Sequence, residues 1–349
     1  MFVKFNETGR NGNIEAYRCL LMLLIVQYHY AELLYPTSNA FWNILFTAFI
    51  FWHVDGFVAI SGWFGIRFTW IKFLKLWGMI TFYWLIDLLY KILSSGQLVP
   101  NDFYYTGSWF GATYLGLMLC APFVNAAIEN LVSKSSRIAW SAWSLLALTV
   151  TLNWAPFHLF TCVSPSGMGS HTFATVLFVY ITARLVQLTR LSDRVKKRHI
   201  FLAIAFLLAS IAFWGLCKTA FQYLRGNSFN WRFFLWQTSY DAPHIWLMSL
   251  AMLVLFARYI KLSEGVSRIC LIVAPSTFPI FLMHTSGWMK NMFSLPFAAW
   301  LESNGVYPAV VTFVSAISVF MIAFCIDVIR RGGVMLLKMG TLRKGSCVD

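Results

Sequence analysis

The stretch IEAYRCLLMLLIVQYHYAELLY, residues 14–35, is apolar enough and long enough to cross a bilayer as one helix. Arg18 lies near its start, and His29 lies deeper within it. The two are eleven positions apart, which is roughly 16 Å along a helix, and eleven steps of about 100° return to nearly the same helix face. A charged or titratable side chain at membrane depth is costly and is a functional-site candidate by default. The stretch therefore predicts a membrane helix whose Arg18 and His29 face one interior cavity.

The rest of the chain has the composition of a membrane protein. Of its 349 residues, 59% are hydrophobic and 11% are charged, and the mean hydropathy is +0.67. Apolar stretches of roughly 20 residues recur along the whole length, which is typical of a polytopic helical membrane protein. The expected fold is an all-α bundle of about ten transmembrane helices, forming a single domain over residues 1–349 without a soluble domain. The expected helices cover approximately residues 14–35, 42–66, 76–93, 108–128, 137–154, 171–189, 200–219, 241–260, 269–288 and 306–328.

Basic side chains set the expected orientation of this bundle. The net charge is +14, but the lysines and arginines flank the apolar segments, so they indicate membrane topology and contact with anionic lipid rather than nucleic-acid binding. With the N-terminus in the cytoplasm, 22 of the 27 lysines and arginines fall on the cytoplasmic side. The positive-inside rule therefore predicts that both termini are cytoplasmic. The seven cysteines are scattered without metal-ligand spacing, so no metal site is expected.

Two further expected helices carry polar residues at membrane depth. The second contains His53 and Asp55 at mid-span, followed by Ser61–Gly62, a small pair that lets backbones approach closely. The ninth carries His284, which is about as far from the start of its helix as His29 is from its own. We therefore expect His29 and His284 at comparable depth, and we expect a structural role for His53.

Each of these residues also has a purely structural interpretation. Arg18 could be a positive-inside anchor, His29 could form an interhelical hydrogen bond, and Asp55 could be half of a buried ion pair. Together they suit acyl transfer, because a neutral imidazole can take a proton from a hydroxyl and a carboxylate can orient that imidazole. Guanidinium groups can bind the phosphates of a carrier such as coenzyme A. The pattern indicates a route from an anionic cytoplasmic donor to an acceptor on the outer side.

These residues resemble motifs of the membrane acyltransferase-3 family, whose members O-acylate bacterial surface sugars. Arg18 and His29 match that family's Arg-x10-His motif in the first helix. The segment HVDGFVAISGWFGIRF, residues 53–68, is similar to its acidic, Phe-rich, Ser-Gly-Phe segment, with Trp63 in place of the usual Phe. The segment GSWFGATYLGLMLCAPFVN, residues 107–125, resembles its Trp-Phe…Tyr-Leu…Pro fourth helix.

Two further segments extend the resemblance, each with a departure. Lys72 and Lys75 stand at the spacing of an Arg-x-x-Arg pair that the family carries in the loop after its second helix. Lysine keeps the charge but loses the bidentate fork of arginine, which weakens the expected phosphate contact. In APSTFPIFLMHTS, residues 274–286, Phe281 replaces a common Tyr and His284 is retained.

The resemblance implies an O-acyltransferase of the bacterial cytoplasmic (inner) membrane. It would move an acyl group, expected to be acetyl, from acetyl-coenzyme A to a hydroxyl of a surface or lipid-linked polysaccharide, with membrane lipid as a further partner. The implied catalytic residues are His29 as base or transient acyl carrier, Arg18, Asp55 as the group that orients His29, and His284 on the acceptor side. The implied donor contacts are Arg67, Lys72, Lys75, Ser61 and Trp109.

Two other functions fit parts of the pattern. A transporter or flippase for a polysaccharide precursor also suits ten spans, broken helices and ionisable groups at mid-membrane. A structural membrane protein is a third interpretation, although such a protein does not need Arg18, His29 and Asp55 inside its bundle.

Overall fold

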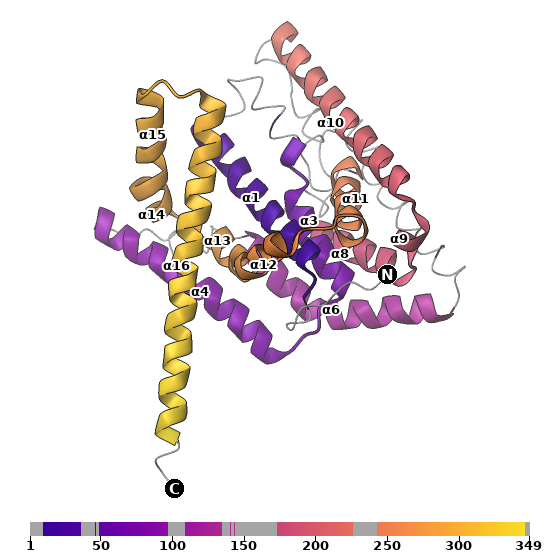
Figure 1. Ribbon diagram of the computed structural model, residues 1–349, viewed down its shortest axis with the longest axis horizontal. Coiled ribbons are helices and arrows are strands. Elements are labelled where there is room, and N and C mark those ends of the chain that lie inside the picture. Colours follow the sequence, from indigo (N-terminus) through magenta and orange to yellow (C-terminus); the bar gives the residue numbers. More distant parts are fainter. Residues whose placement is uncertain are drawn as a thin grey trace.

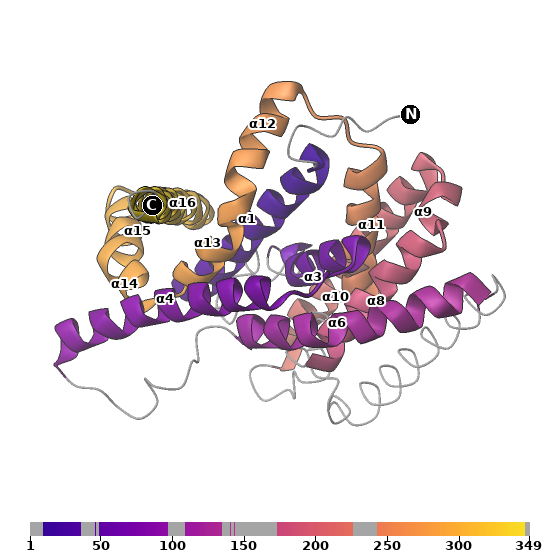
Figure 2. The same cartoon turned by 90° about the horizontal axis from the view of Figure 1, so that it is seen from below.

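Helix α1 (Gly12–Leu34) lies in the middle of the computed structural model (Figures 1 and 2). Its N-cap is Asn11, whose side chain accepts a hydrogen bond of 3.0 Å from the backbone N–H of Asn13. Tyr17 and Val26 lie on opposite faces of the helix, and both are fully buried. A helix that is apolar all round is a buried helix, and α1 packs against α3, α11, α12, α13 and α16.

The structure describes residues 10–35, 46, 49–96, 109–134, 140, 143, 173–225 and 243–345. All regular secondary structure within these residues is helical, as the all-α fold class predicts. Besides α1, the elements are α3 (His53–Phe64), α4 (Trp70–Ser95), α6 (Trp109–Lys134), α8 (Phe173–Leu188), α9 (Leu191–Arg194), α10 (Lys197–Arg225), α11 (Pro243–Arg258), α12 (Glu264–Val273), η3 (Ala274–Ser276), α13 (Thr277–Met283), α14 (Gly287–Met289), η4 (Lys290–Ser294), α15 (Leu295–Ser303) and α16 (Pro308–Gly345).

Four described segments are long and apolar enough to cross a membrane, so the chain is a helical membrane protein. They are α4, α6, the run Glu264–Met283 and the part Pro308–Val334 of α16. The expected helix over residues 137–154 lies almost wholly outside the described residues, as does the first part of the one over 42–66. The count of ten transmembrane helices and the cytoplasmic termini stay predictions.

Helix α4 begins six residues earlier than expected. Thr69 is its N-cap, and the Thr69 hydroxyl accepts a hydrogen bond of 3.3 Å from the backbone N–H of Lys72. Lys72 and Lys75 therefore lie in the first two turns of a helix, and their expected place in a loop is wrong. At a spacing of three residues on a helix, the two lysines share one face.

The expected ninth helix, residues 269–288, is broken in the structure. Helix α12 passes into the 3-10 turn η3 at Pro275 and then into α13, which ends at Met283. Proline lacks the backbone donor that would continue the ladder, and local 3-10 and π turns re-satisfy the freed groups. The chain then continues as α14, the π-helical turn η4 and α15, although the sequence predicted no helix over 289–305. Figures 1 and 2 show that α14 and α15 lie alongside α16.

Close packing of α3 on α8 depends on Gly62. A methyl group at this position would overlap the backbone carbonyl of Tyr180, which confirms that Ser61–Gly62 lets two backbones approach closely. The chain leaves α3 through Gly65, whose φ of 71° favours glycine. The next residue, Ile66, accepts a hydrogen bond of 3.1 Å from the Asn125 side chain and donates one of 2.9 Å to the Tyr180 hydroxyl. The connection between α3 and α4 is therefore held by α6 and α8.

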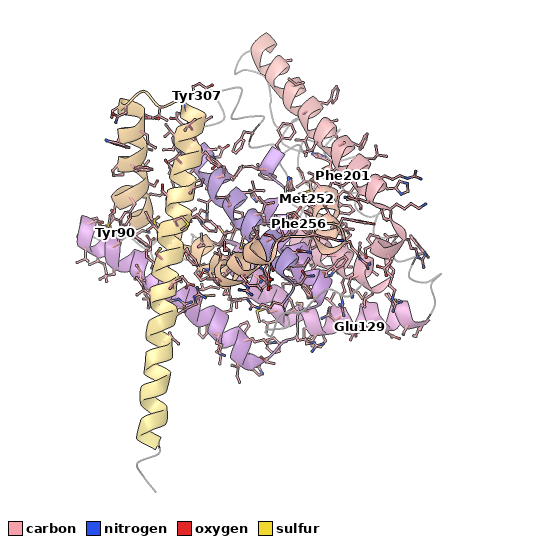
Figure 3. The ribbon with its side chains drawn as sticks, in the orientation of Figure 1. Tyr90, Glu129, Phe201, Met252, Phe256 and Tyr307 are labelled. Atoms are coloured by element: carbon pink, nitrogen blue, oxygen red, sulfur yellow. The ribbon has the colours of Figure 1, made fainter. Side chains whose placement is uncertain are left out.

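The outer surface of the bundle is apolar. Figure 3 shows Phe201 on α10 and Tyr307 before α16 on the outside of the molecule, where they are 49% and 63% exposed. Phe256 on α11 lies in the core and stacks on Tyr17 with ring centroids 5.0 Å apart. Large exposed apolar side chains of this kind are expected where a helix faces lipid.

Candidate active site

His29 and His284 are in contact at the centre of the candidate site. The Nε2 atom of His284 lies 3.1 Å from the Nδ1 atom of His29, and the ring centroids are 4.8 Å apart. His284 is 1% exposed and His29 is partly buried. The comparable depth expected from the sequence agrees with this contact, whereas the catalytic roles of the two residues stay predictions.

Neighbouring carbonyl groups determine which nitrogen of each ring carries the proton. The Nδ1 atom of His284 lies 2.6 Å from the carbonyl oxygen of Phe281, so it must be an N–H donor. In a neutral imidazole the Nε2 atom of His284 is then an acceptor, which requires a proton on the Nδ1 atom of His29. That proton also lies 3.0 Å from the carbonyl oxygen of Ile25. Neutral His29 therefore carries its lone pair on Nε2, the form that a general base needs.

The broken helix explains the position of His284. The last carbonyls of a helix lack intrahelical donors. At the end of α13 the His284 ring donates to Phe281, and the Ser286 hydroxyl donates to the carbonyl of Met283 at 2.6 Å. The Tyr30 hydroxyl of α1 donates to the carbonyl of His284 at 3.2 Å. The same groups that cap α13 thus hold His284 against α1.

Aromatic rings form the walls of the site. Tyr28 lies edge-on to both His29 and His53, with centroid distances of 5.3 and 5.4 Å. Phe281 lies against His284 at 5.5 Å and against Phe110 of α6 at 5.4 Å. His53, for which the sequence predicted only a structural role, is fully buried beside this cluster. Its contacts with the rings of Tyr28 of α1 and of Phe51, two residues before α3, were not visible from hydropathy.

Arg18 and Asp55 each have a contact near the start of α1. The Arg18 guanidinium forms an ion pair of 3.0 Å with Glu15, one turn earlier on α1, and its side chain is 26% exposed. Asp55 is 3% exposed and lies close to Tyr17. Tyr17 in turn donates a hydrogen bond of 2.9 Å to the carbonyl of Ser249. The proposed action of Asp55 on His29 stays a prediction.

The expected donor contacts lie around the connection between α3 and α4. Arg67, Lys72 and Lys75 are exposed, and the Lys72 ammonium donates to the carbonyl of Arg67 at 3.3 Å. The backbone amides at the start of α4 point toward the same region, so the end of the helix and the two lysines favour an anion together. This arrangement is compatible with phosphate binding.

Ser61 and Trp109 sit deeper in the bundle than these basic residues. The Ser61 hydroxyl bonds the Tyr114 hydroxyl at 2.9 Å and the carbonyl of Phe57 at 3.1 Å. Trp109 begins α6, and its ring is 5.8 Å from that of Phe110, which contacts Phe281 in the site. Their contact with the donor stays a prediction.

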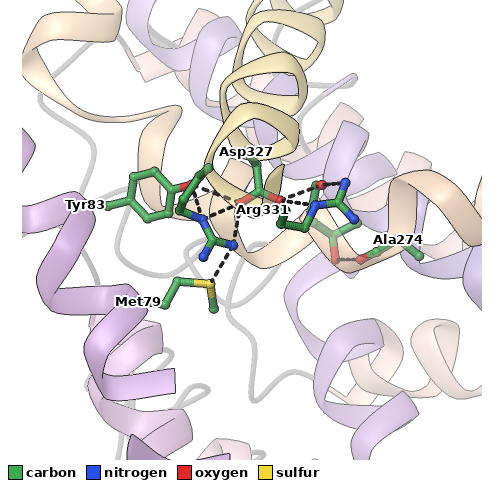
Figure 4. Close-up of polar contacts among 8 residues, drawn as sticks. Met79, Tyr83, Ala274, Asp327 and Arg331 are labelled. Carbon is green, nitrogen blue, oxygen red and sulfur yellow. Dashed lines mark hydrogen bonds and ion pairs between the residues drawn. The ribbon is translucent and has the colours of Figure 1, made fainter. Parts of the chain in front are cut away.

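The sequence analysis missed a second buried polar cluster, centred on Asp327 of α16 (Figure 4). This carboxylate is fully buried and forms ion pairs with Arg330 at 2.7 Å and with Arg331 at 3.2 Å. It also accepts hydrogen bonds from Tyr83 of α4 at 3.0 Å and from Ser276 of η3 at 2.7 Å. A carboxylate inside an apolar run, with arginines three and four residues later, is the sequence signal that predicts such a cluster.

No protein-family model, curated protein or solved structure matches the chain.

Proposed function

We propose that the protein is an integral membrane O-acyltransferase of the bacterial inner membrane, as the resemblance to the acyltransferase-3 family implies. It transfers an acyl group, expected to be acetyl, from cytoplasmic acyl-coenzyme A to a hydroxyl of a surface or lipid-linked polysaccharide. The observation that carries the proposal is the contact between His29 and His284 inside the bundle. This contact supports His29 as a general base whose proton lies on a defined ring nitrogen. Its surroundings are of low polarity, where electrostatic interactions are strong.

The proposed chemistry uses His29 as the general base. Its Nε2 atom takes the proton of the acceptor hydroxyl while the hydroxyl oxygen forms a bond to the thioester carbonyl carbon. The carbon–sulfur bond then breaks, and His29 returns the proton to the departing coenzyme A thiolate. In the variant with an acyl carrier, the same Nε2 atom attacks the thioester carbonyl first and the coenzyme A thiolate leaves. The acyl group then passes from the imidazole to the hydroxyl, whose proton goes to the thiolate.

In this scheme His284 orients His29. Its Nε2 atom accepts the Nδ1–H of His29 and stabilises the imidazolium that forms when His29 takes a proton, as a carboxylate does in a Ser-His-Asp triad. The sequence suggested Asp55 for this task and placed His284 at the acceptor. The contact of 3.1 Å between the two rings favours His284 as the orienting group, and Asp55, beside Tyr17 near the start of α1, stays a candidate for catalysis.

The donor phosphates would bind at the start of α4. Arg67, Lys72 and Lys75 supply positive charge there, and Arg18 supplies a further guanidinium at the same expected side of the membrane. Their exposure lets a soluble anionic donor reach them from the cytoplasm. The acyl group would then reach His29, roughly 16 Å deeper along α1.

The test is an acyl-transfer assay with three proteins in nanodiscs: the wild type, His29→Ala and His199→Ala. His199 is an exposed histidine of α10, so its variant controls for loss of a histidine elsewhere. Each is incubated with radiolabelled acetyl-coenzyme A and a crude envelope polysaccharide fraction. We expect label on the polysaccharide with the wild type and His199→Ala, and none with His29→Ala. Transfer by His29→Ala at the wild-type rate would remove His29 from the mechanism.

A precursor transporter or flippase is the second candidate, and the broken run from α12 to α15 favours it. Discontinuous helices with ionisable groups near mid-membrane form the substrate sites of many transporters. If none of the three proteins transfers label or binds coenzyme A, while the wild type moves a labelled glycolipid across a vesicle bilayer, this candidate replaces the acyltransferase.

A further inference from the structure

A pocket of about 440 Å³ lies between α16 and the segment formed by η4 and α15. Phe293 and Phe297 line it from one side, and Ser315, Ser318 and Met321 line it from α16. Figures 1 and 2 show these helices side by side at the edge of the molecule, away from α8 and α10. Its apolar rim is open to the surroundings, since Phe293 is 40% exposed and Met321 is 50% exposed. Because α16 is apolar enough to cross a membrane, this rim faces lipid.

The hydroxyl of Ser315, which is fully buried, has no hydrogen-bond partner among the described residues. Among the same residues, the hydroxyl of Ser294, which is 2% exposed, has only the Tyr30 hydroxyl beside it. A buried hydroxyl without a partner costs free energy, so native structures nearly always provide one. Ser318 is different, because its hydroxyl donates to the carbonyl of Val314 on its own helix at 2.8 Å. The pocket therefore holds one hydroxyl without a partner in the described part of the chain, Ser315, and a second hydroxyl, Ser294, in apolar walls.

Ser294 is also the last residue of the π-helical turn η4. Single π turns inside helices are rare and are frequent at functional sites. This turn directs the Ser294 hydroxyl into the pocket, opposite the face of α16 that carries Ser315. A ligand that satisfies both hydroxyls must present an acceptor oxygen next to a hydrocarbon chain.

The depth of the pocket selects among membrane amphiphiles. Ser315 lies seven residues after Pro308, which is about 10 Å along α16. The 27-residue span Pro308–Val334 is about 40 Å long and exceeds a hydrocarbon core of about 30 Å by about 5 Å at each end. Ser315 is then within about 5 Å of the hydrocarbon boundary, where the ester carbonyls of phospholipids lie. A polyprenyl chain has no oxygen at that depth.

We propose that this pocket binds one acyl chain of a membrane phospholipid, whose ester carbonyl accepts hydrogen bonds from Ser294 and Ser315. The bound lipid joins α15 to α16 and lies one side chain away from the candidate active site. Ser294 is beside Tyr30, and the Tyr30 hydroxyl donates to the carbonyl of His284. The site requires the membrane environment alone and does not depend on acyl transfer.

The experiment is photo-crosslinking in nanodiscs of phosphatidylcholine. A trace lipid carries a diazirine on its acyl chain, in one series with ester linkages and in the other with ether linkages, which lack the carbonyl. Crosslinked peptides are quantified by mass spectrometry for the wild type, for the double variant Ser294→Ala/Ser315→Ala and for the control Ser318→Ala. The exposed apolar face of α4, with Trp77 and Leu85, serves as the reference for contact with bulk lipid.

We expect the ester lipid to label the pocket residues of the wild type and of Ser318→Ala roughly fivefold more than the ether lipid, because only the ester offers the acceptor. The double variant loses this preference. Equal labelling by the two lipids in the wild type, or labelling no stronger than that of α4, overturns the proposal. Loss of the label on adding polyprenyl phosphate, but not phosphatidylcholine, would assign the pocket to a different lipid and overturn it as well. If the double variant does not fold, the comparison of the two lipids on the wild type decides.

Discussion

At the scale of single residues, the candidate site depends on one contact between two rings that are 255 residues apart in the sequence. Both rings are held by carbonyl groups: His284 by Phe281 and His29 by Ile25. These two carbonyls indicate which nitrogen of each ring carries the proton. We therefore expect His284 to act through His29 as a positioning residue. Its loss should then lower kcat, whereas loss of a substrate contact would raise KM.

Replacement of His284 tests this assignment. We expect His284→Ala to lower kcat roughly 100-fold or more, with little change in the KM for acetyl-coenzyme A, because the orienting acceptor for His29 is lost and donor binding is not. His284→Asn keeps an acceptor oxygen and should recover part of kcat. Steady-state kinetics with purified protein measure both constants. A rise in KM at constant kcat would instead identify His284 as a binding residue.

At the scale of elements, two kinds of contact hold the helices that carry the site. One is a buried polar cluster, and the other is a close approach between two backbones. The Asp327 cluster joins α16 to α4 and η3, next to the break that positions His284. The Gly62 contact joins α3 to α8 and fixes the connection that carries Arg67. Both features are buried, so we expect substitutions there to change the stability of the fold more than the proposed reaction.

Removal of the Asp327 carboxylate should be strongly destabilising. Asp327→Ala leaves Arg330 and Arg331 without their buried anion, for which breaking a buried pair costs about 3–5 kcal/mol. The matched control is Glu264→Ala, since the pair of Glu264 with Arg268 is largely exposed and is worth about 1 kcal/mol or less. Thermal unfolding in detergent, followed by gel filtration, compares the two. Equal thermal-unfolding midpoints for the two variants would mean that the Asp327 cluster does not stabilise the fold.

Gly62→Ala should also destabilise the fold, by about 1–3 kcal/mol, because the new methyl group forces α3 away from the Tyr180 carbonyl. Gly78→Ala on α4 provides the comparison, because a methyl group there meets no other atom within 4 Å. It should leave stability unchanged or raise it slightly. The same unfolding assay applies, and a Gly62→Ala variant as stable as Gly78→Ala would contradict the close approach.

At the scale of the whole molecule, each end of α1 is joined to a distant segment by a side-chain hydrogen bond. Tyr35, after α1, donates a hydrogen bond to Glu302 near the end of α15, so these ends lie together. At the opposite end of α1, the Asn13 side chain donates to the carbonyl of Ile260 at 2.7 Å. Three basic residues lie near Ile260 in the sequence: Arg258, Lys261 and Arg268. Arg258 and Lys261, which are expected in the cytoplasm, therefore flank a residue that contacts the start of α1.

Reporter fusions test the orientation that follows. We expect green fluorescent protein fused after Asp349 to fluoresce, and alkaline phosphatase inserted at residues 304–307 to be active, because the positive-inside rule puts these positions on opposite sides. The reciprocal fusions should be silent. An active phosphatase after Asp349 would invert the orientation and move the proposed donor site to the outer face.

Local properties of the sequence were sufficient to predict a helical membrane protein and the approximate first and last residues of α1, the helix that carries Arg18 and His29. Hydropathy and a period of 3.6 residues act over one helix, so they can be read without knowledge of neighbours. The same local patterns did not predict the early start of α4 or the 3-10 turn η3 between α12 and α13. Capping and proline effects can shift the ends of helices by whole turns.

Only the tertiary structure decided which polar groups meet. The sequence indicated that His29 and His284 lie at similar depth, but their contact depends on where the broken ninth helix turns back. It likewise gave no sign that Asp327 meets Tyr83 and Ser276, or that two serines share a lipid-facing pocket. Contacts between helices depend on the packing of every side chain around them, and no single segment contains that information.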